Sequence, residues 1–163
     1  MILRKANSGE LSEIVGLYRS AIGTEGCVWN ENYPTEEDAL IDLACGGLYV
    51  LLDGGEIVGA VSVLGENELE ELDCWTVRDG NHREIVRVVV KQTRRGEGLS
   101  KQMLKLLFEK LTQDGVTSIR LIAAKGNTAA LKTDEALGFT YYDECFMFGH
   151  CYLPAEKRLR SGL

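Results

Sequence analysis

The sequence has few of the features that mark membrane, secreted or metal-binding proteins. It contains no run of about 18 apolar residues, which a membrane-spanning helix would need. The opening segment MILRKANSGE lacks the apolar core of a signal peptide. The five cysteines form no CxxC pair and accompany only two histidines, so we expect neither a disulfide framework nor a metal site. These absences predict a cytoplasmic protein without a membrane partner.

Positive charge is also scarce. The chain carries 18 Lys and Arg against 25 Asp and Glu, a formal net charge of -7. A nucleic-acid-binding protein needs a basic face to meet phosphates, so no nucleic-acid partner is expected. A length of 163 residues with 45% hydrophobic content fits one domain with one core. We assign the domain to residues 1–153 and interpret residues 154–163 as a short basic C-terminal tail.

Apolar periodicity predicts strands and helices that do not form a repeating βαβ array. Asn7 and Glu10 form a capping-box pattern before the first helix, and Thr35 is a second helix cap. Gly54 and Gly55 separate two apolar runs, which is typical of a β-hairpin. Strands are expected at 2–6, 48–53, 56–64, 84–90, 117–124 and within 139–153, with helices after Asn7, Thr35, Gly98 and Asn127. This order predicts an α/β domain with a mixed sheet.

The junction RRGEGLS, residues 94–100, joins the valine-rich strand to a long amphipathic helix. Backbone N–H groups at a helix start bind anions, and Gly96 and Gly98 remove side chains that would hold a diphosphate away. The spacing excludes a Walker A loop and a dinucleotide-binding motif. Four residues add positive charge here: Lys91, Arg94, Arg95 and Lys101. The simpler alternative is that the two glycines only serve a tight turn.

Two sequence blocks carry a resemblance to a known family. Arg95, Gly98 and Ser100, with Val90 five residues before Arg95, resemble the acetyl-CoA-binding motif of the GNAT superfamily of N-acetyltransferases. Ser100 stands where Gly or Ala is usual. The second block is Asn127-x-x-Ala130 followed by Leu137-Gly138-Phe139, which resembles the later helix of the same family.

The resemblance implies a GNAT fold, with a mixed, mostly antiparallel sheet of six to seven strands flanked by about four helices. It implies acetyl-CoA as acyl donor, with pantetheine lying between two splayed strands against the backbone of Val88, Val89 and Val90. The diphosphate would bind the segment Arg94, Arg95, Gly96, Glu97, Gly98, Leu99 and Ser100. Asn127 and Ala130 would make a further cofactor contact, although Asn127 is equally an ordinary helix cap.

The implied reaction is acetyl transfer to a primary amine that attacks acetyl-CoA directly in a ternary complex. Glu84 is the candidate general base, because it occupies the position of the catalytic glutamate in histone-acetyltransferase-like members. The alternative is that Glu84 is a solvated residue at a strand start. Three carboxylates of the preceding segment compete for the same role: Glu70, Glu71 and Asp73.

The proton donor to the departing thiolate is less clearly marked. Many relatives have a tyrosine where this chain has Asp134, and a carboxyl with an ordinary pKa is ionised at neutral pH. Tyr141 or Tyr142 could substitute, or the step could need no donor. Cys145 is interpreted as a buried structural residue, since neither histidine stands at a motif position. The missing tyrosine keeps open the alternative of a non-catalytic acyl-CoA-binding or sensor domain.

The surface that binds the acceptor amine is expected in the loop that follows the first helix. Trp29 and Tyr33 could contact a substrate amine, and Trp75 could line the opposite side. The alternative is that these rings only cover the core. The acceptor class, a small-molecule or peptide amine, stays open. The resemblance also allows a homodimer formed through the C-terminal strands.

Overall fold

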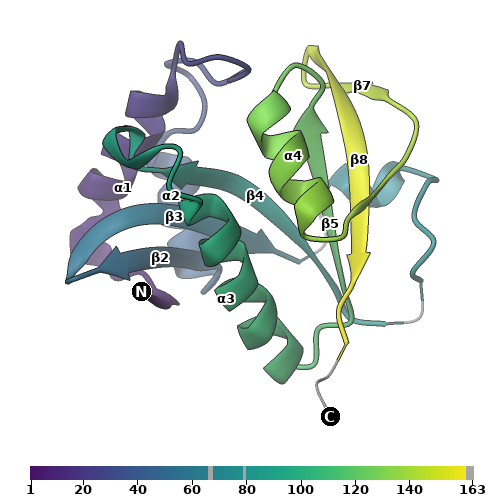
Figure 1. Ribbon diagram of the computed structural model, residues 1–163, viewed down its shortest axis with the longest axis horizontal. Helices are drawn as coiled ribbons and strands as arrows, with labels where there is room; N and C mark the ends of the chain where they lie inside the picture. Colours follow the sequence, from purple (N-terminus) through teal and green to yellow (C-terminus); the bar gives the residue numbers. More distant parts are fainter. Residues whose placement is uncertain (66–67, 79, 161–163) are drawn as a thin grey trace.

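Alternating apolar residues build a mixed sheet in the computed structural model, which describes residues 1–65, 68–78 and 80–160 (Figure 1). Its strands are β1 (Ile2–Lys5), β2 (Leu48–Asp53), β3 (Glu56–Leu64), β4 (His82–Val90), β5 (Ser118–Ala124), β6 (Thr140–Tyr141), β7 (Cys145–Met147) and β8 (His150–Arg158). Their order is β1-β2-β3-β4-β5-β8-β6, with β7 paired to β8, and β4–β5 is the parallel pair of the described sheet. The mostly antiparallel sheet is confirmed. It has eight strands because the C-terminal segment forms three.

The helices begin where the sequence places caps. They are α1 (Leu11–Ala21), α2 (Glu36–Ala44), α3 (Leu99–Gln113) and α4 (Thr128–Ala136), with 3-10 turns η1 (Ser8–Glu10), η2 (Glu68–Glu71) and η3 (Gln92–Arg94). Asn7 with Glu10 and Thr35 with Asp38 form capping boxes. Within the described ranges, every helix is too short or too polar to cross a membrane.

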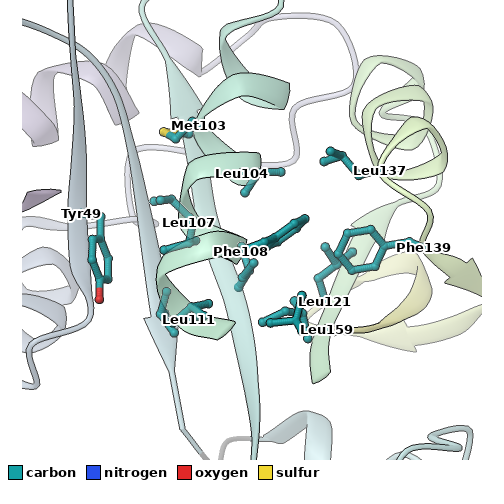
Figure 2. Close-up of a cluster of buried hydrophobic side chains, with 14 of the residues drawn as sticks. Tyr49, Met103, Leu104, Leu107, Phe108, Leu111, Leu121, Leu137, Phe139 and Leu159 are labelled. Carbon is teal, nitrogen blue, oxygen red and sulfur yellow. The ribbon is translucent and has the colours of Figure 1, made fainter. Parts of the chain in front are cut away.

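The two faces of the sheet pack against different helices. On β2, Tyr49 and Leu51 join a cluster beneath α3, whereas Leu48 and Val50 join a cluster beneath α1 and α2. This division follows from the alternation of side chains along a strand. Figure 1 shows α3 and α4 in front of the sheet and α2 behind it. We call the cluster beneath α3 the front cluster. Figure 2 shows the side chains that α3 contributes to it: Met103, Leu104, Leu107, Phe108 and Leu111.

The C-terminal boundary differs from the expected one. Residues 154–158, predicted to be tail, form the second half of β8 and pair with β5 from Ile122↔Pro154 to Ser118↔Arg158. Ala155 and Glu156 are buried there. The sequence suggested a tail because Pro154 cannot donate a strand hydrogen bond and the following residues are mostly charged. Residues 161–163 lie outside the described part.

The sheet divides into two arms at β4 and β5. These strands pair only through His82↔Ser118, Arg83↔Ile119 and Glu84↔Arg120, and then they diverge (Figure 1). The first arm comprises β1–β4, and the second arm comprises β5–β8. Beyond Glu84 and Arg120, the facing edges of β4 and β5 have no main-chain pairing with each other among the described residues. We call this break in the pairing the gap.

Candidate active site

At alternate residues of β4, the main-chain N–H and C=O groups point into the gap, where β5 does not pair with them. The Lys91 N–H donates to the Val58 carbonyl on β3 at 2.8 Å. Since main-chain groups alternate in direction along a strand, those of Val90 and Val88 are directed away from β3 and into the gap. Val89, paired with Ala60, is directed toward β3. Two of the three predicted valines therefore offer main-chain groups to a ligand between the strands.

The first turn of α3 also has open N–H groups. Gly98 is its N-cap, with φ of 74°, and no side chain caps the helix. By contrast, η1, α2 and α4 are each capped by a side chain, from Asn7, Thr35 and Asn127. Uncapped N–H groups at the positive end of a helix dipole form an anion site. The uncapped start of α3 lies within residues 94–100, where the diphosphate site is predicted.

The two neighbouring arginines of this junction have different surroundings. The Arg94 guanidinium forms ion pairs with Asp53 at 2.9 Å and with Glu97 at 2.9 Å. The Arg95 side chain is exposed, with no hydrogen bond or ion pair to the described part of the chain. Arg95 is therefore available for a phosphate, whereas Arg94 and Glu97 brace the loop. Leu99 is buried in the front cluster and contributes its main chain only.

The start of α4 lies at the open end of the gap. The Asn127 side chain accepts a hydrogen bond from the Ala130 N–H at 3.2 Å, so it caps the helix. A Cβ atom added to Gly26 would lie 2.6 Å from the Asn127 Cα and 2.7 Å from the Gly126 carbonyl oxygen. The loop between α1 and α2 thus touches the loop between β5 and α4. The two arms meet again at this contact.

A β-bulge interrupts β4 beside the gap. Ala60 pairs with Val89 and Ser62 pairs with Val86, so Arg87 and Val88 both lie opposite Val61. The Arg87 φ of 52° is left-handed. Its guanidinium donates to both Asp42 carboxylate oxygens, at 2.8 and 2.7 Å, and to the Tyr33 hydroxyl at 2.9 Å. Arg87 is not among the residues predicted for the site, although an arginine inside a valine-rich strand was a usable signal.

Glu84 is the last residue of β4 that pairs with β5, so it lies at the closed end of the gap. It has no exposed surface and lies in register with Arg120. The alternative that Glu84 is a solvated residue at a strand start is therefore wrong. Among its competitors, Glu70 is hydrogen-bonded to Arg120 and His82, while Glu71 and Asp73 are exposed.

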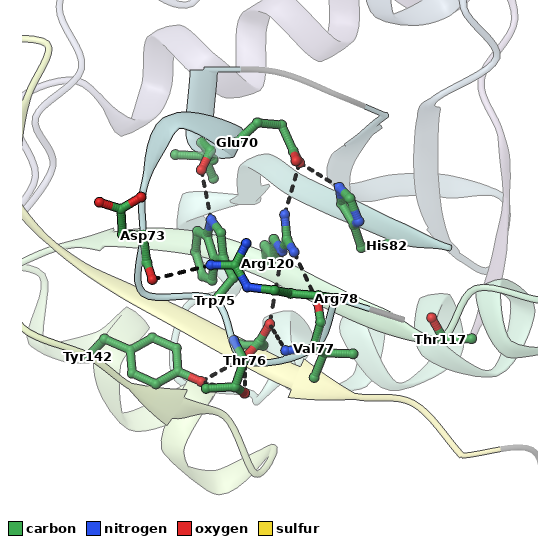
Figure 3. Close-up of polar contacts among 12 residues, drawn as sticks. Glu70, Asp73, Trp75, Thr76, Val77, Arg78, His82, Thr117, Arg120 and Tyr142 are labelled. Atoms are coloured by element: carbon green, nitrogen blue, oxygen red, sulfur yellow. Dashed lines mark hydrogen bonds and ion pairs between the residues drawn. The ribbon is translucent and has the colours of Figure 1, made fainter. Parts of the chain in front are cut away.

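The structure does not place Trp75 at an acceptor surface. Its ring is 3% exposed, its Nε1 donates to the Leu69 carbonyl at 2.7 Å, and the Arg120 guanidinium lies 5.0 Å from the ring centroid (Figure 3). The expected substrate role is corrected to a structural one, because the ring fixes the segment 68–78 on the second arm. Trp29 is half-buried and packs edge-on against Tyr18. Tyr33 is 41% exposed, so it is the predicted aromatic most open to an acceptor.

The two candidate acid tyrosines lie in different surroundings. The Tyr142 hydroxyl donates to Glu156 at 2.7 Å and lies 3.2 Å from the Thr76 hydroxyl (Figure 3). The Tyr141 hydroxyl donates to the Leu131 carbonyl at 3.0 Å and lies 3.3 Å from Asp134 Oδ2. Burial raises the pKa of Asp134 to about 6, which corrects the expectation of an ordinary value. The structure therefore joins Tyr141 and Asp134 into one pair.

Cys145 is half-buried rather than buried, and in the described part of the chain its side chain has no hydrogen-bond or ion-pair partner that would activate it. Burial raises the pKa of its thiol, which disfavours the reactive thiolate. In the part of the chain that the structure describes, no three or more His, Cys, Asp or Glu side chains are grouped to hold a metal ion.

Comparison with known proteins identifies the fold and the chemistry. The profile of the Acetyltransferase (GNAT) family matches residues 14–139, more than half of the chain. The chain belongs to the GNAT acetyltransferase family. It is an acyltransferase that uses acetyl-CoA, and the open N–H groups of α3, the exposed Arg95 and the main chain of Val88 and Val90 suit that donor.

Individual relatives agree with this assignment. This chain is 27% identical over 141 residues to the L-methionine sulfoximine/L-methionine sulfone acetyltransferase of Pseudomonas paraeruginosa. The match covers 84% of this chain and 78% of that protein. A GNAT acetyltransferase from Streptococcus agalactiae superposes with a TM-score of 0.82 at 20% identity, covering 98% of this chain and 96% of that one. The Salmonella typhimurium protein yncA, solved with acetyl-CoA, gives 0.74 at 20% identity, covering 100% and 96%.

Proposed function

We propose that this enzyme acetylates the primary amine of a small, amino-acid-like acceptor. The main support for this proposal is the contact between Gly26 and Asn127. Because of this contact, the α1–α2 loop lies against the second arm and limits the space for a long peptide. Tyr33 presents an exposed ring from the same loop, and an aromatic face attracts an ammonium group. The relative named for L-methionine sulfoximine and L-methionine sulfone supports an acceptor of this class.

The donor is proposed to lie along the β4 side of the gap. Its diphosphate meets the first-turn N–H groups of α3 and the Arg95 guanidinium, where Gly96, Gly98 and Ser100 permit close approach. Its pantetheine bonds the main chain of Val88 and Val90. The Val88 N–H polarises the thioester carbonyl, which gains negative charge as the amine attacks.

The reaction needs one proton acceptor and one proton donor. As the nitrogen–carbon bond forms and the carbon–sulfur bond breaks, the amine loses a proton that we assign to Glu84 through a water molecule. The thiolate leaves with a negative charge and takes a proton from the Tyr141 hydroxyl, beside Asp134. Tyr142 donates to the Glu156 carboxylate, which holds the proton more strongly than the Leu131 carbonyl that Tyr141 bonds, so we prefer Tyr141. The raised pKa of Asp134 supports a protonated carboxyl close to Tyr141 in part of the population near neutral pH.

An acetyl-CoA consumption assay tests the proposal. Thiol release is measured with free amino acids, including methionine sulfone and methionine sulfoximine, and with matched dipeptides and polyamines. We expect amino acids to give the largest kcat/KM and an N-acetylated product by mass spectrometry. A dipeptide preferred over its own N-terminal amino acid by about tenfold or more, equivalent to about 1.4 kcal/mol, would contradict the small-acceptor assignment.

Two further expectations stay proposals. We place the enzyme in the cytoplasm, since Cys27, Cys45, Cys74, Cys145 and Cys151 are all free thiols, as a reducing compartment favours. A homodimer through the C-terminal strands would use the outer edge of β7, beside the exposed Phe146 and Phe148. Sedimentation analysis measures that association directly.

A further inference from the structure

Arg87 has an unusual backbone conformation for its position. Of the described residues, Arg87 and Phe148 are the non-glycine residues with positive φ. Phe148 lies between β7 and β8, where a turn calls for such a conformation. Arg87 lies in the middle of β4, where a side chain makes a left-handed residue unfavourable. Other contacts must therefore stabilise the bulge.

The Arg87 side chain supplies these contacts. Its Nε and Nη2 bind the two oxygens of Asp42, which is 1% exposed and also accepts a hydrogen bond from the Ser62 hydroxyl at 2.5 Å. This network joins α2, β3 and β4. Removing one partner from a buried ion pair leaves an uncompensated charge, so the pair resists opening. The guanidinium is held in one place, and the backbone that carries it is held as well.

The same guanidinium reaches the acceptor loop. Its Nη1 donates to the Tyr33 hydroxyl, and its carbon lies 5.9 Å from the centroid of the Tyr33 ring. The Asp42 carboxylate neutralises the guanidinium, so a substrate anion would gain little from it. Arg87 is better suited to hold protein groups in place than to bind substrate.

We propose that Arg87 is a positioning residue that serves both substrates of the transfer. Through its ion pair with Asp42 it keeps β4 bulged, and the bulge sets the position of the Val88 N–H, which is directed into the gap, relative to the thioester carbonyl. Through its hydrogen bond it holds Tyr33 beside the acceptor amine. The inference rests on the acetyl transfer proposed for this site.

Two substitutions separate the backbone effect from the side-chain effect. Arg87→Gly removes the side chain but tolerates a positive φ, so the bulge can persist. Arg87→Val removes the side chain and disfavours a positive φ, so β4 should become regular. We expect the KM for the acceptor to rise several-fold in both variants, because both release Tyr33. We expect kcat to fall roughly 100-fold in Arg87→Val, as for the loss of one oxyanion donor, and less than about tenfold in Arg87→Gly.

Equal loss of kcat in the two variants would overturn the role of the bulge, and an unchanged acceptor KM in both would overturn the hold on Tyr33. Arg83→Gly is the matched control. It makes the same change on the same strand before the bulge, and it should leave both constants near wild type. Tyr33→Phe removes only the exposed hydroxyl and should raise the acceptor KM with kcat unchanged. An unchanged KM there contradicts the hydrogen bond's role independently of Arg87.

An acceptor-independent measurement separates this inference from the proposed function. In the wild-type enzyme, the Val88 amide resonance should differ between the CoA-bound and acetyl-CoA-bound states. The difference should disappear in Arg87→Val or, if that variant does not fold, shrink in the isosteric Asp42→Asn. Persistence of the wild-type difference in the folded variant overturns the inference alone. If wild-type enzyme binds no acetyl-CoA and releases no thiol with any amine, the proposed function fails.

Discussion

The two sides of the gap are built differently. On the first side, β4 carries the Arg87 bulge, and the following helix α3 starts at a left-handed glycine without a side-chain cap. On the second side, β5 pairs with β8 at every residue from Ser118 to Ala124, and the following helix α4 is capped by Asn127. The first side combines an irregular strand with an uncapped helix start, whereas the second side combines a regular strand with a capped helix.

This difference indicates that the two sides of the gap have different roles. Unsatisfied N–H groups and strained backbone cost stability unless a ligand or a reaction uses them. We therefore expect substitutions on the β4 side to change binding and turnover, and those on the second arm to change mainly stability. The Tyr141–Asp134 pair is the exception proposed on the second arm.

The largest effect is expected at Glu84. Glu84→Gln keeps the shape of the side chain but removes the proton acceptor, so kcat should fall roughly 100- to 1,000-fold with the affinity for CoA unchanged. Glu156→Gln is the matched control, since Glu156 is another buried carboxylate near Arg120, on the second arm. It should lower the free energy of unfolding and leave kcat within a few-fold. A pH–rate profile for Glu84→Gln identical to that of the wild type removes Glu84 from the base role.

Next in size is the start of α3. Gly98→Val places a β-branched side chain at φ of 74°, which should distort the loop and weaken CoA binding roughly 50- to 100-fold by calorimetry. Gly115→Val at the other end of α3, with φ of 84°, tests the same backbone strain away from the ligand. An added Cβ meets no atom within 4 Å at either glycine. Equal loss of affinity in both variants would show that helix stability, and not the anion site, governs binding.

The third effect is on stability rather than on binding, and it is expected at Asp134. Burial raises its pKa from 3.8 to about 6, so the folded state holds this proton more tightly than the unfolded state. The resulting stabilisation is present below pH 3.8 and is lost as the pH rises through about 6, a loss of about 3 kcal/mol. In urea titrations, Asp134→Asn should gain stability over the wild type between pH 4.5 and 7.5. A difference that does not vary with pH would contradict the buried titration.

The smallest effect separates the two neighbouring arginines. Arg95→Ala should weaken CoA binding roughly five- to tenfold, about 1 kcal/mol, because its guanidinium is free to meet a phosphate. The loss should diminish at high salt. Arg94→Ala should have the weaker effect, because Arg94 is already paired with Asp53 and Glu97. If the order of the two effects is reversed, Arg94 must leave its ion pairs when the donor binds.

Local patterns in the sequence were enough to predict most elements. The caps at Asn7, Thr35 and Asn127, the hairpin at Gly54-Gly55 and the junction at 94–100 depend on residues within a few positions of one another. Such features need no tertiary information. The candidate anion site is local in the same way, because a helix start carries its own N–H groups and dipole.

Features that depend on distant contacts could not be predicted. Trp75 is buried in the folded protein, where Arg120, which follows it by 45 positions in the sequence, lies against its ring. The raised pKa of Asp134 depends on burial by the rest of the fold, and the second half of β8 needs β5 as a partner. The Arg87 bulge shows only in the register of β3 against β4. Each of these depends on packing across the sheet.

The close approach of Gly26 to Asn127 has a consequence for redesigning the enzyme. The loop is anchored at its first part, where even a methyl group would collide with main chain. Residues 27–33 follow this anchor and carry the exposed Tyr33. A graft that exchanges only residues 27–33 should therefore change which amine is accepted while the donor's binding surface stays intact, whereas a graft that also replaces Gly26 would push the two arms apart.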